Sequence, residues 1–201
     1  VRRPDGGPAV LKLGDPDQLN HQAELMLADQ GRSHALVLDH DPEAAALLLE
    51  RLGPPVAVVV EDPLEQFRLL AEVLRVWWRI PLTLGSDVGS KAEGLLGILR
   101  VQGAQFGEPA PTAIGLAAEL AQTLAATEVA EVVCHGDPHP WNLLEHAAVE
   151  HEAGSGWRFV DPDGCPGERA YDLGVVIRRM ESRATHPGPD SGFLRQAAQL
   201  L

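Results

Sequence analysis

The sequence CHGDPHPWN at residues 134–142, with FVDPDG at residues 159–164, is the part of the chain that decides the fold. Asp137 is followed five positions later by Asn142, and Asp161 comes after an intervening polar stretch. In kinase-type phosphoryl transfer, one aspartate accepts the proton of the attacking hydroxyl, while an asparagine and a later aspartate hold Mg²⁺. This reaction needs positioning and charge neutralisation, which one carboxylate and two oxygen ligands supply. The spacing predicts a phosphoryl-transfer site.

The residues around the motif predict the structure that such a site needs. The run EVVC at residues 131–134 is apolar, as in a buried strand, and apolar residues also follow Asn142 and precede Asp161. The stretch between them, residues 145–156, is polar and ends in Gly-Ser-Gly, which is typical of a hairpin connection. Two antiparallel strands joined in this way bring Asn142 and Asp161 side by side, although 19 positions separate them in the sequence.

Three motifs together resemble a known family. HGD at residues 135–137 with Asn142, VDPDG at residues 160–164 and GERAYDLG at residues 167–174 are similar to the aminoglycoside phosphotransferases. Within that family the chain resembles the branch of streptomycin 6-kinases and hydroxyurea-type antibiotic resistance kinases. The match is dense over residues 132–179 and looser back to residue 10.

The resemblance implies a two-lobed, protein-kinase-like α+β fold. A small β-rich N-terminal lobe would cover residues 1–52, and a larger, mainly helical C-terminal lobe residues 53–201. It also implies ATP and Mg²⁺ as cofactors, with Asp137 as the catalytic base and Asn142 and Asp161 as the metal ligands. Asp172 resembles the family's structural carboxylate, which ties the backbone of the catalytic loop.

A phosphate-binding lysine is expected on the strand at residues 8–13, where Lys12 interrupts an apolar run. Asp15 and Pro16 then predict the start of a helix, and a kinase-like small lobe pairs such a lysine with a helix glutamate, here Glu24. Lys12 is one of only two lysines among 16 basic side chains, which favours a site that needs a compact point charge. The alternative is an edge-strand lysine that extends to solvent.

The nucleotide's adenine is expected at a hinge between the lobes. Residues 35–39 and 45–52 are predicted strands, and Gly53-Pro54-Pro55 breaks the second one. In a two-lobed kinase, backbone groups around Glu50, Arg51 and Leu52 would bind the adenine edge. An ordinary hydrophobic strand that ends at a proline-rich turn has the same pattern, and only the resemblance favours the hinge.

The expected reaction transfers the γ-phosphoryl group of ATP to a hydroxyl of a small molecule, with an aminoglycoside of the streptomycin type as the leading acceptor. The net charge of −13 suits a cationic acceptor and disfavours nucleic acid or an anionic membrane as a partner. An acidic cleft is therefore expected beside Asp137, with Asp163 and Glu168 nearest in the sequence. His135 is expected to organise the loop from a buried position, and His139 either to face a ligand or to pack.

Other interpretations of the same residues stay open. A kinase of a different small hydroxylated metabolite would share the scaffold. A nucleotide-binding pseudokinase is a rival because no Gly-rich hairpin precedes residue 10 and the sequence stops where relatives continue with further helices, so both lobes look incomplete. A metal-dependent hydrolase would use the His and Asp side chains of residues 135–163 as ligands, but it leaves Asn142 and Lys12 unexplained. A structural turn would not need Asp137 and Asn142 at this spacing.

Length and composition agree with a folded protein of one large domain or two small lobes. The 201 residues are 45% hydrophobic, enough to fill a core. No apolar run is long enough to span a bilayer and no export signal opens the sequence. The two cysteines, Cys134 and Cys165, lack the spacing of metal ligands, which favours the cytoplasm as the location.

Overall fold

A computed structural model describes residues 1–84, 111–126, 130–146 and 156–181, together with residues 94, 96–99, 101 and 196. The elements follow in the order β1 (Ala9–Leu13), α1 (Pro16–Asp29), β2 (Val37–Asp41), β3 (Ala46–Glu50), α2 (Val56–Val59), α3 (Pro63–Trp77), the 3₁₀ turn η1 (Leu82–Leu84), α5 (Pro111–Ala126), β4 (Glu131–Cys134), β5 (Leu143–Glu145), β6 (Trp157–Phe159), β7 (Cys165–Glu168) and α6 (Arg169–Glu181). None of the helices in these residues is both long enough and apolar enough to cross a membrane.

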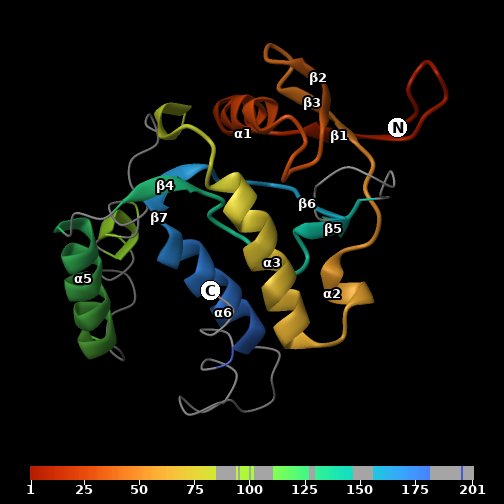
Figure 1. The fold of residues 1–201 in the computed structure, drawn as a ribbon. Helices are drawn as coiled ribbons and strands as arrows, with labels where there is room; N and C mark the ends of the chain where they lie inside the picture. The colour runs from red at the N-terminus through yellow and green to blue at the C-terminus, as the bar shows by residue number, and fades with distance from the viewer. Residues whose placement is uncertain are drawn as a thin grey trace.

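The first 50 residues form a small antiparallel sheet with one helix beside it (Figure 1). The strand order is β1-β3-β2, so the two predicted strands after the helix are confirmed, and β3 pairs with β1 over its whole length. Helix α1 begins where it was expected, because the Asp15 carboxylate accepts hydrogen bonds from the backbone N–H groups of Asp17 and Gln18. Its buried face, Leu19, Ala23 and Met26, packs on the sheet side chains Leu47 and Leu49.

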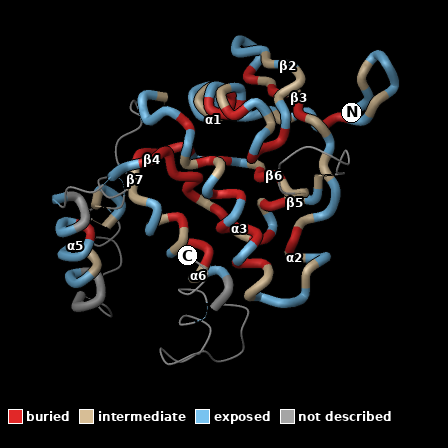
Figure 2. The backbone as a smooth tube through the Cα atoms, viewed as in Figure 1, coloured by how far each residue is buried: buried red, intermediate tan, exposed pale blue. Residues whose placement is uncertain are grey.

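Helices α3 and α6 lie side by side below the small sheet and carry the main core (Figure 1). Buried residues follow the inner face of α3, and Figure 2 shows them continuing into β4 and α6. Phe67 and Trp77 are fully buried in this core, as large apolar side chains usually are. Two short antiparallel pairs accompany these helices: β4–β7 lies at the upper end of α6, and β5–β6 lies beside α3, below the small sheet.

Backbone hydrogen bonds join residues 1–53 to the strands that carry the motifs. The N–H of Gly53 donates to the Glu145 carbonyl at 2.7 Å. In the loop after α1, the Ser33 carbonyl accepts from Phe159 N–H at 2.7 Å, and the Ala35 N–H donates to the Phe159 carbonyl at 2.9 Å. The small sheet is therefore positioned directly against the strand that leads into Asp161.

Candidate active site

The loop between β4 and β5 is held by one buried carboxylate. Asp172, in the first turn of α6, accepts hydrogen bonds from the backbone N–H groups of His135 and Gly136 and from Trp78 Nε1, each at 2.9 Å. Burial raises the pKa of Asp172 above its ordinary value, and these three donors oppose that rise. Gly136 has a φ of +91°, and a Cβ there would collide with Asp163, so only glycine fits this turn. The implied role of Asp172 as a structural carboxylate agrees with these contacts.

His135 links the same loop to the strand before Asp161. Its Nδ1 lies 3.3 Å from the Asp137 backbone N–H, which can only donate, so Nε2 carries the proton and donates to the Val160 carbonyl at 3.2 Å. The ring is fully buried, and burial lowers the pKa of His135 to about 4. His135 is thus the buried organiser that was expected. Because both ring nitrogens are engaged, it is not available as a metal ligand.

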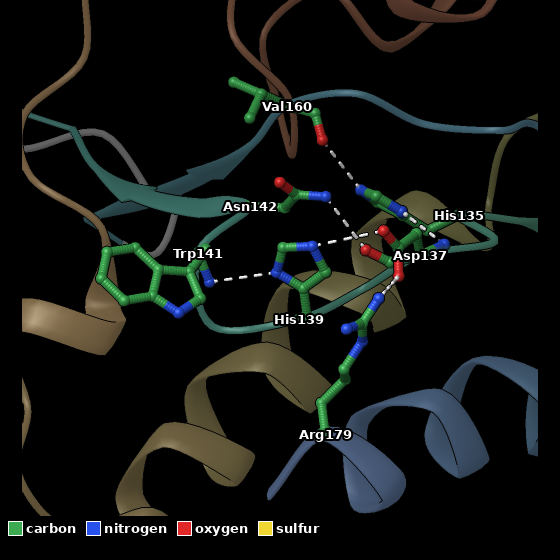
Figure 3. Close-up of polar contacts among 7 residues, drawn as sticks. All are labelled: His135, Asp137, His139, Trp141, Asn142, Val160 and Arg179. Atoms are coloured by element: carbon green, nitrogen blue, oxygen red, sulfur yellow. Dashed lines mark hydrogen bonds and ion pairs between the residues drawn. The ribbon is translucent and has the colours of Figure 1, made fainter. Parts of the chain in front are cut away.

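The loop also carries the Asp137 carboxylate, the predicted catalytic base, and Figure 3 shows its surroundings. Its Oδ2 lies 3.2 Å from His139 Nε2, and its Oδ1 lies 3.5 Å from Arg179 Nη2, which comes from α6. The Asp137 side chain is 37% exposed, so a ligand in solution can reach it. A cationic side chain, that of Arg179, therefore lies against Asp137, and the acidic cleft expected beside Asp137 stays a prediction.

Asn142 and Asp161 lie on neighbouring strand ends, as the hairpin prediction required. Strand β5 pairs with β6 in the register Leu143↔Phe159, and the Val160 N–H donates to the Asn142 carbonyl at 3.0 Å. The connecting residues 147–155 lie outside the described residues. The Asn142 Nδ2 donates to the Asp137 carbonyl at 3.1 Å, which leaves its amide oxygen as the group that can bind a cation.

Asp161 is held in an unusual backbone conformation with a φ of +58°. Non-glycine residues rarely adopt this left-handed region, and residues that do so concentrate at functional sites. The Asp161 Oδ1 lies 2.6 Å from Lys12 Nζ, which bridges 149 positions of sequence. Lys12 is therefore not a lysine directed into solvent: its side chain joins the small sheet to the second motif.

The second partner of Lys12 differs from the prediction. Lys12 Nζ donates to Gln22 Oε1 at 2.6 Å, whereas the Glu24 side chain is exposed on the outer side of α1. The two positions differ by two residues, or about 200° around a helix, so only one of them faces Lys12. The expected Lys12–Glu24 ion pair is not formed. The sequence analysis missed Gln22, although it lies three residues after buried Leu19 and this helical spacing could have identified it.

A cleft of about 380 Å³ opens between the small sheet and the β5–β6 strands. Lys12 and Asp161 lie at the polar end of the cleft. Glu50, Arg51 and Leu52 line the cleft at the end of β3. Its remaining lining is apolar: Val10, Leu11, Ala35, Leu49, Leu144 and Val160. In the part of the chain that the structure describes, the backbone groups of Arg51 and Leu52 make no hydrogen bond. A flat heterocycle with polar edges fits this combination of apolar walls and free backbone groups.

Asp163 and Glu168, the two acidic residues expected near Asp137, occupy different places in the structure. Asp163 donates its N–H to the His135 carbonyl at 2.7 Å and so helps to close the turn after Asp161. Glu168 lies in β7 opposite Glu131. Among the described residues, no group of three or more His, Cys, Asp or Glu side chains converges as a metal cluster. Arg179, which no sequence signal identified, is the further residue that tertiary structure brings to Asp137.

Comparison with known proteins gives consistent results. A family model described as aminoglycoside/hydroxyurea antibiotic resistance kinase matches residues 1–201. Streptomycin 6-kinase of Streptomyces griseus is 31% identical over 216 residues, which cover 100% of this chain and 64% of that protein. Streptomycin 6-kinase of Streptomyces glaucescens is 32% identical, with 86% of this chain and 55% of that protein covered. The chain thus spans less than two thirds of the length of these relatives.

Solved structures share the fold. The aminoglycoside phosphotransferase APH(3'')-Id of Streptomyces rimosus, determined with ADP and streptomycin, aligns with a TM-score of 0.58 and 18% identity, over 98% of this chain and 79% of that one. An aminoglycoside-3'-phosphotransferase of type VIII aligns with a TM-score of 0.55 and 18% identity, over 99% and 84%. The predicted kinase-like α+β fold is confirmed.

Proposed function

The chain belongs to the aminoglycoside/hydroxyurea antibiotic resistance kinase family, and we propose that it transfers the γ-phosphoryl group of ATP to a hydroxyl of a small molecule. The observation that carries this proposal is the Lys12–Asp161 contact at the polar end of the cleft, close to the loop of Asp137 and Asn142. An aminoglycoside of the streptomycin type is the acceptor we favour, because two relatives that match most of the chain are streptomycin 6-kinases. We propose the cytoplasm, where ATP is supplied, as the location of the reaction.

The cleft supports nucleotide binding with the adenine inside and the phosphates at Lys12. Residues 1–52 would form the nucleotide-binding lobe and residues 53–201 the lobe with the catalytic loop. The apolar side chains Val10, Ala35 and Val160 would cover the faces of the ring, and the free backbone groups of Arg51 and Leu52 would bind its edge. Lys12 would exchange part of its contact with Asp161 for phosphate oxygens. Glu24 has no part in this proposal, because it does not face the cleft.

The residues also fit Mg²⁺. This ion keeps several waters and takes one or two protein carboxylates besides phosphate oxygens, and Asp161 with the Asn142 amide oxygen offers such a set. When bound, it would neutralise charge on the phosphates. Asp161 is already held with its carboxylate toward Lys12, at the end of the cleft where the phosphates would lie.

Asp137 would act at the acceptor. As the acceptor oxygen forms its bond to the γ-phosphorus, the bond from that phosphorus to the bridging oxygen of ADP breaks, and the acceptor's proton passes to the Asp137 carboxylate. The carboxylate is exposed enough to meet a hydroxyl, and the backbone beneath it is fixed by Asp172.

A phosphate-transfer assay tests the proposal. Streptomycin, other aminoglycosides and simple hydroxylated metabolites are offered with ATP and Mg²⁺, and nucleotide binding is measured separately by calorimetry. Asp137→Asn should lower turnover by about 100-fold or more while the nucleotide affinity stays unchanged, because only the proton acceptor is lost. Asp161→Ala should instead weaken binding of the magnesium nucleotide. Nucleotide binding without turnover of any acceptor would favour a pseudokinase, and near-normal turnover in Asp137→Asn would exclude the assigned base.

A further inference from the structure

His139 makes two hydrogen bonds that fix its protonation state (Figure 3). Its Nδ1 lies 3.2 Å from the backbone nitrogen of Trp141, and its Nε2 lies 3.2 Å from Asp137 Oδ2. A backbone N–H is always a donor, so Nδ1 is the acceptor and carries no proton. The proton of the neutral ring is then on Nε2, where it donates to the Asp137 carboxylate. The His139 ring is therefore the Nε2–H tautomer, which can donate a hydrogen bond to the Asp137 carboxylate.

The surroundings of His139 hold the ring in place. The side chain is only 17% exposed. Its backbone is also fixed, because the His139 carbonyl accepts from the Asn142 N–H at 2.8 Å. A neutral ring directs Asp137 without cancelling the negative charge that a proton acceptor needs.

The two oxygens of Asp137 have different surroundings. Oδ2 faces the mostly buried His139 ring, whereas Oδ1 faces Arg179 Nη2 at 3.5 Å, and the Arg179 side chain is 49% exposed. A long contact to an exposed arginine is weak, since solvent screens it and the side chain must be ordered to make it. An incoming acceptor hydroxyl can therefore displace Arg179 from Oδ1 more easily than it can displace the mostly buried His139 from Oδ2.

We propose that His139 is a positioning residue that holds Asp137 through Oδ2, so that Oδ1 is the oxygen that receives the acceptor's proton. This inference rests on the proposed function and adds to it the identity of the reacting oxygen. During the transfer the acceptor proton moves to Oδ1 as the new O–P bond forms and the bond to ADP breaks. His139 keeps its own proton on Nε2 throughout, so it orients the base and does not relay the proton.

Two substitutions of His139 separate this role from packing. His139→Gln places an amide N–H close to the position of Nε2, whereas His139→Leu fills a similar volume with no donor. We expect His139→Leu to lower kcat about 10- to 100-fold, as fits the loss of one hydrogen bond to a charged group, and His139→Gln to recover most of it. Nucleotide affinity should stay unchanged in both variants. His40→Leu, which removes a histidine bonded to Asn20 beside the small sheet, is the matched control and should keep full activity.

The outcomes distinguish this inference from the proposed function. If Asp137→Asn is inactive but His139→Leu keeps full kcat, the assignment of Asp137 as the catalytic base is supported and the positioning role of His139 is wrong. Equal losses in the Leu and Gln variants would also overturn it, because donation from Nε2 would not be what matters. If no acceptor is turned over at all, ¹⁵N NMR can still identify the tautomer of the His139 ring. The Nε2–H tautomer at neutral pH supports the inference, and the Nδ1–H tautomer refutes it.

Discussion

Asp172→Ala should destabilise the protein strongly, because the Asp172 carboxylate accepts hydrogen bonds from three buried or partly buried donors. Truncation would leave the N–H groups of His135 and Gly136 and the Trp78 indole N–H without their carboxylate. Removing one member of a buried charged network costs about 3–5 kcal/mol of unfolding free energy. For a chain of this length, that corresponds to a fall in Tm of about 10 °C.

Thermal unfolding followed by circular dichroism, with urea unfolding at 25 °C, measures this loss. Glu72→Ala is the control: Glu72 lies exposed on α3 and pairs with Arg68 at 3.0 Å, so its loss should cost less than about 1 kcal/mol. Trp78→Phe removes one of the three donors while Asp172 keeps the other two, and it should give a smaller loss than Asp172→Ala. Turnover by Asp172→Ala should also fall at temperatures where it remains folded, because the backbone of residues 135–136 is no longer held. A Tm within about 2 °C of the wild type would refute the reasoning, since three orphaned donors cannot cost so little.

Two further measurements test the surroundings of Asp137. Burial lowers the pKa of His135 from 6.5 to about 4, so the unfolded chain binds this proton more readily and stability should decline as the pH falls from 6.5 to 4, by about 3 kcal/mol. Urea unfolding at pH 7 and pH 4.5 should show that decline, and a His135→Asn variant should show less of it; an equal slope in both would contradict the assignment. Arg179→Gln should lower KM for a cationic acceptor by up to about fivefold at low salt and leave nucleotide affinity unchanged, because it removes a like charge at Asp137 Oδ1. Arg178→Gln, one position earlier on α6, is the control, and a higher KM in Arg179→Gln would instead show that Arg179 binds an anionic part of the acceptor.

The parts of the site that depend on short-range geometry could be predicted from the sequence. Asp137 and Asn142 belong to one loop, and the hairpin pattern around residues 143–159 was enough to place Asn142 beside Asp161. The N-cap at Asp15 fixed the start of α1, and the apolar strand with one lysine located Lys12. In each case the spacing along the chain sets the spacing in space, because a tight turn, a paired strand or a helix cap allows few backbone conformations.

The contacts that depend on how separate elements pack could not be predicted from the sequence and are seen only in the folded chain. The rotation of α1 about its axis brings Gln22 rather than Glu24 to Lys12, and a shift of two residues reverses the face of a helix. Arg179 reaches Asp137 across 42 positions because α6 packs beside the catalytic loop, and Cys134 and Cys165, unremarkable in the sequence, lie directly opposite each other in β4 and β7. Helix rotation and packing are set by the burial of whole apolar faces, a property that no single motif encodes.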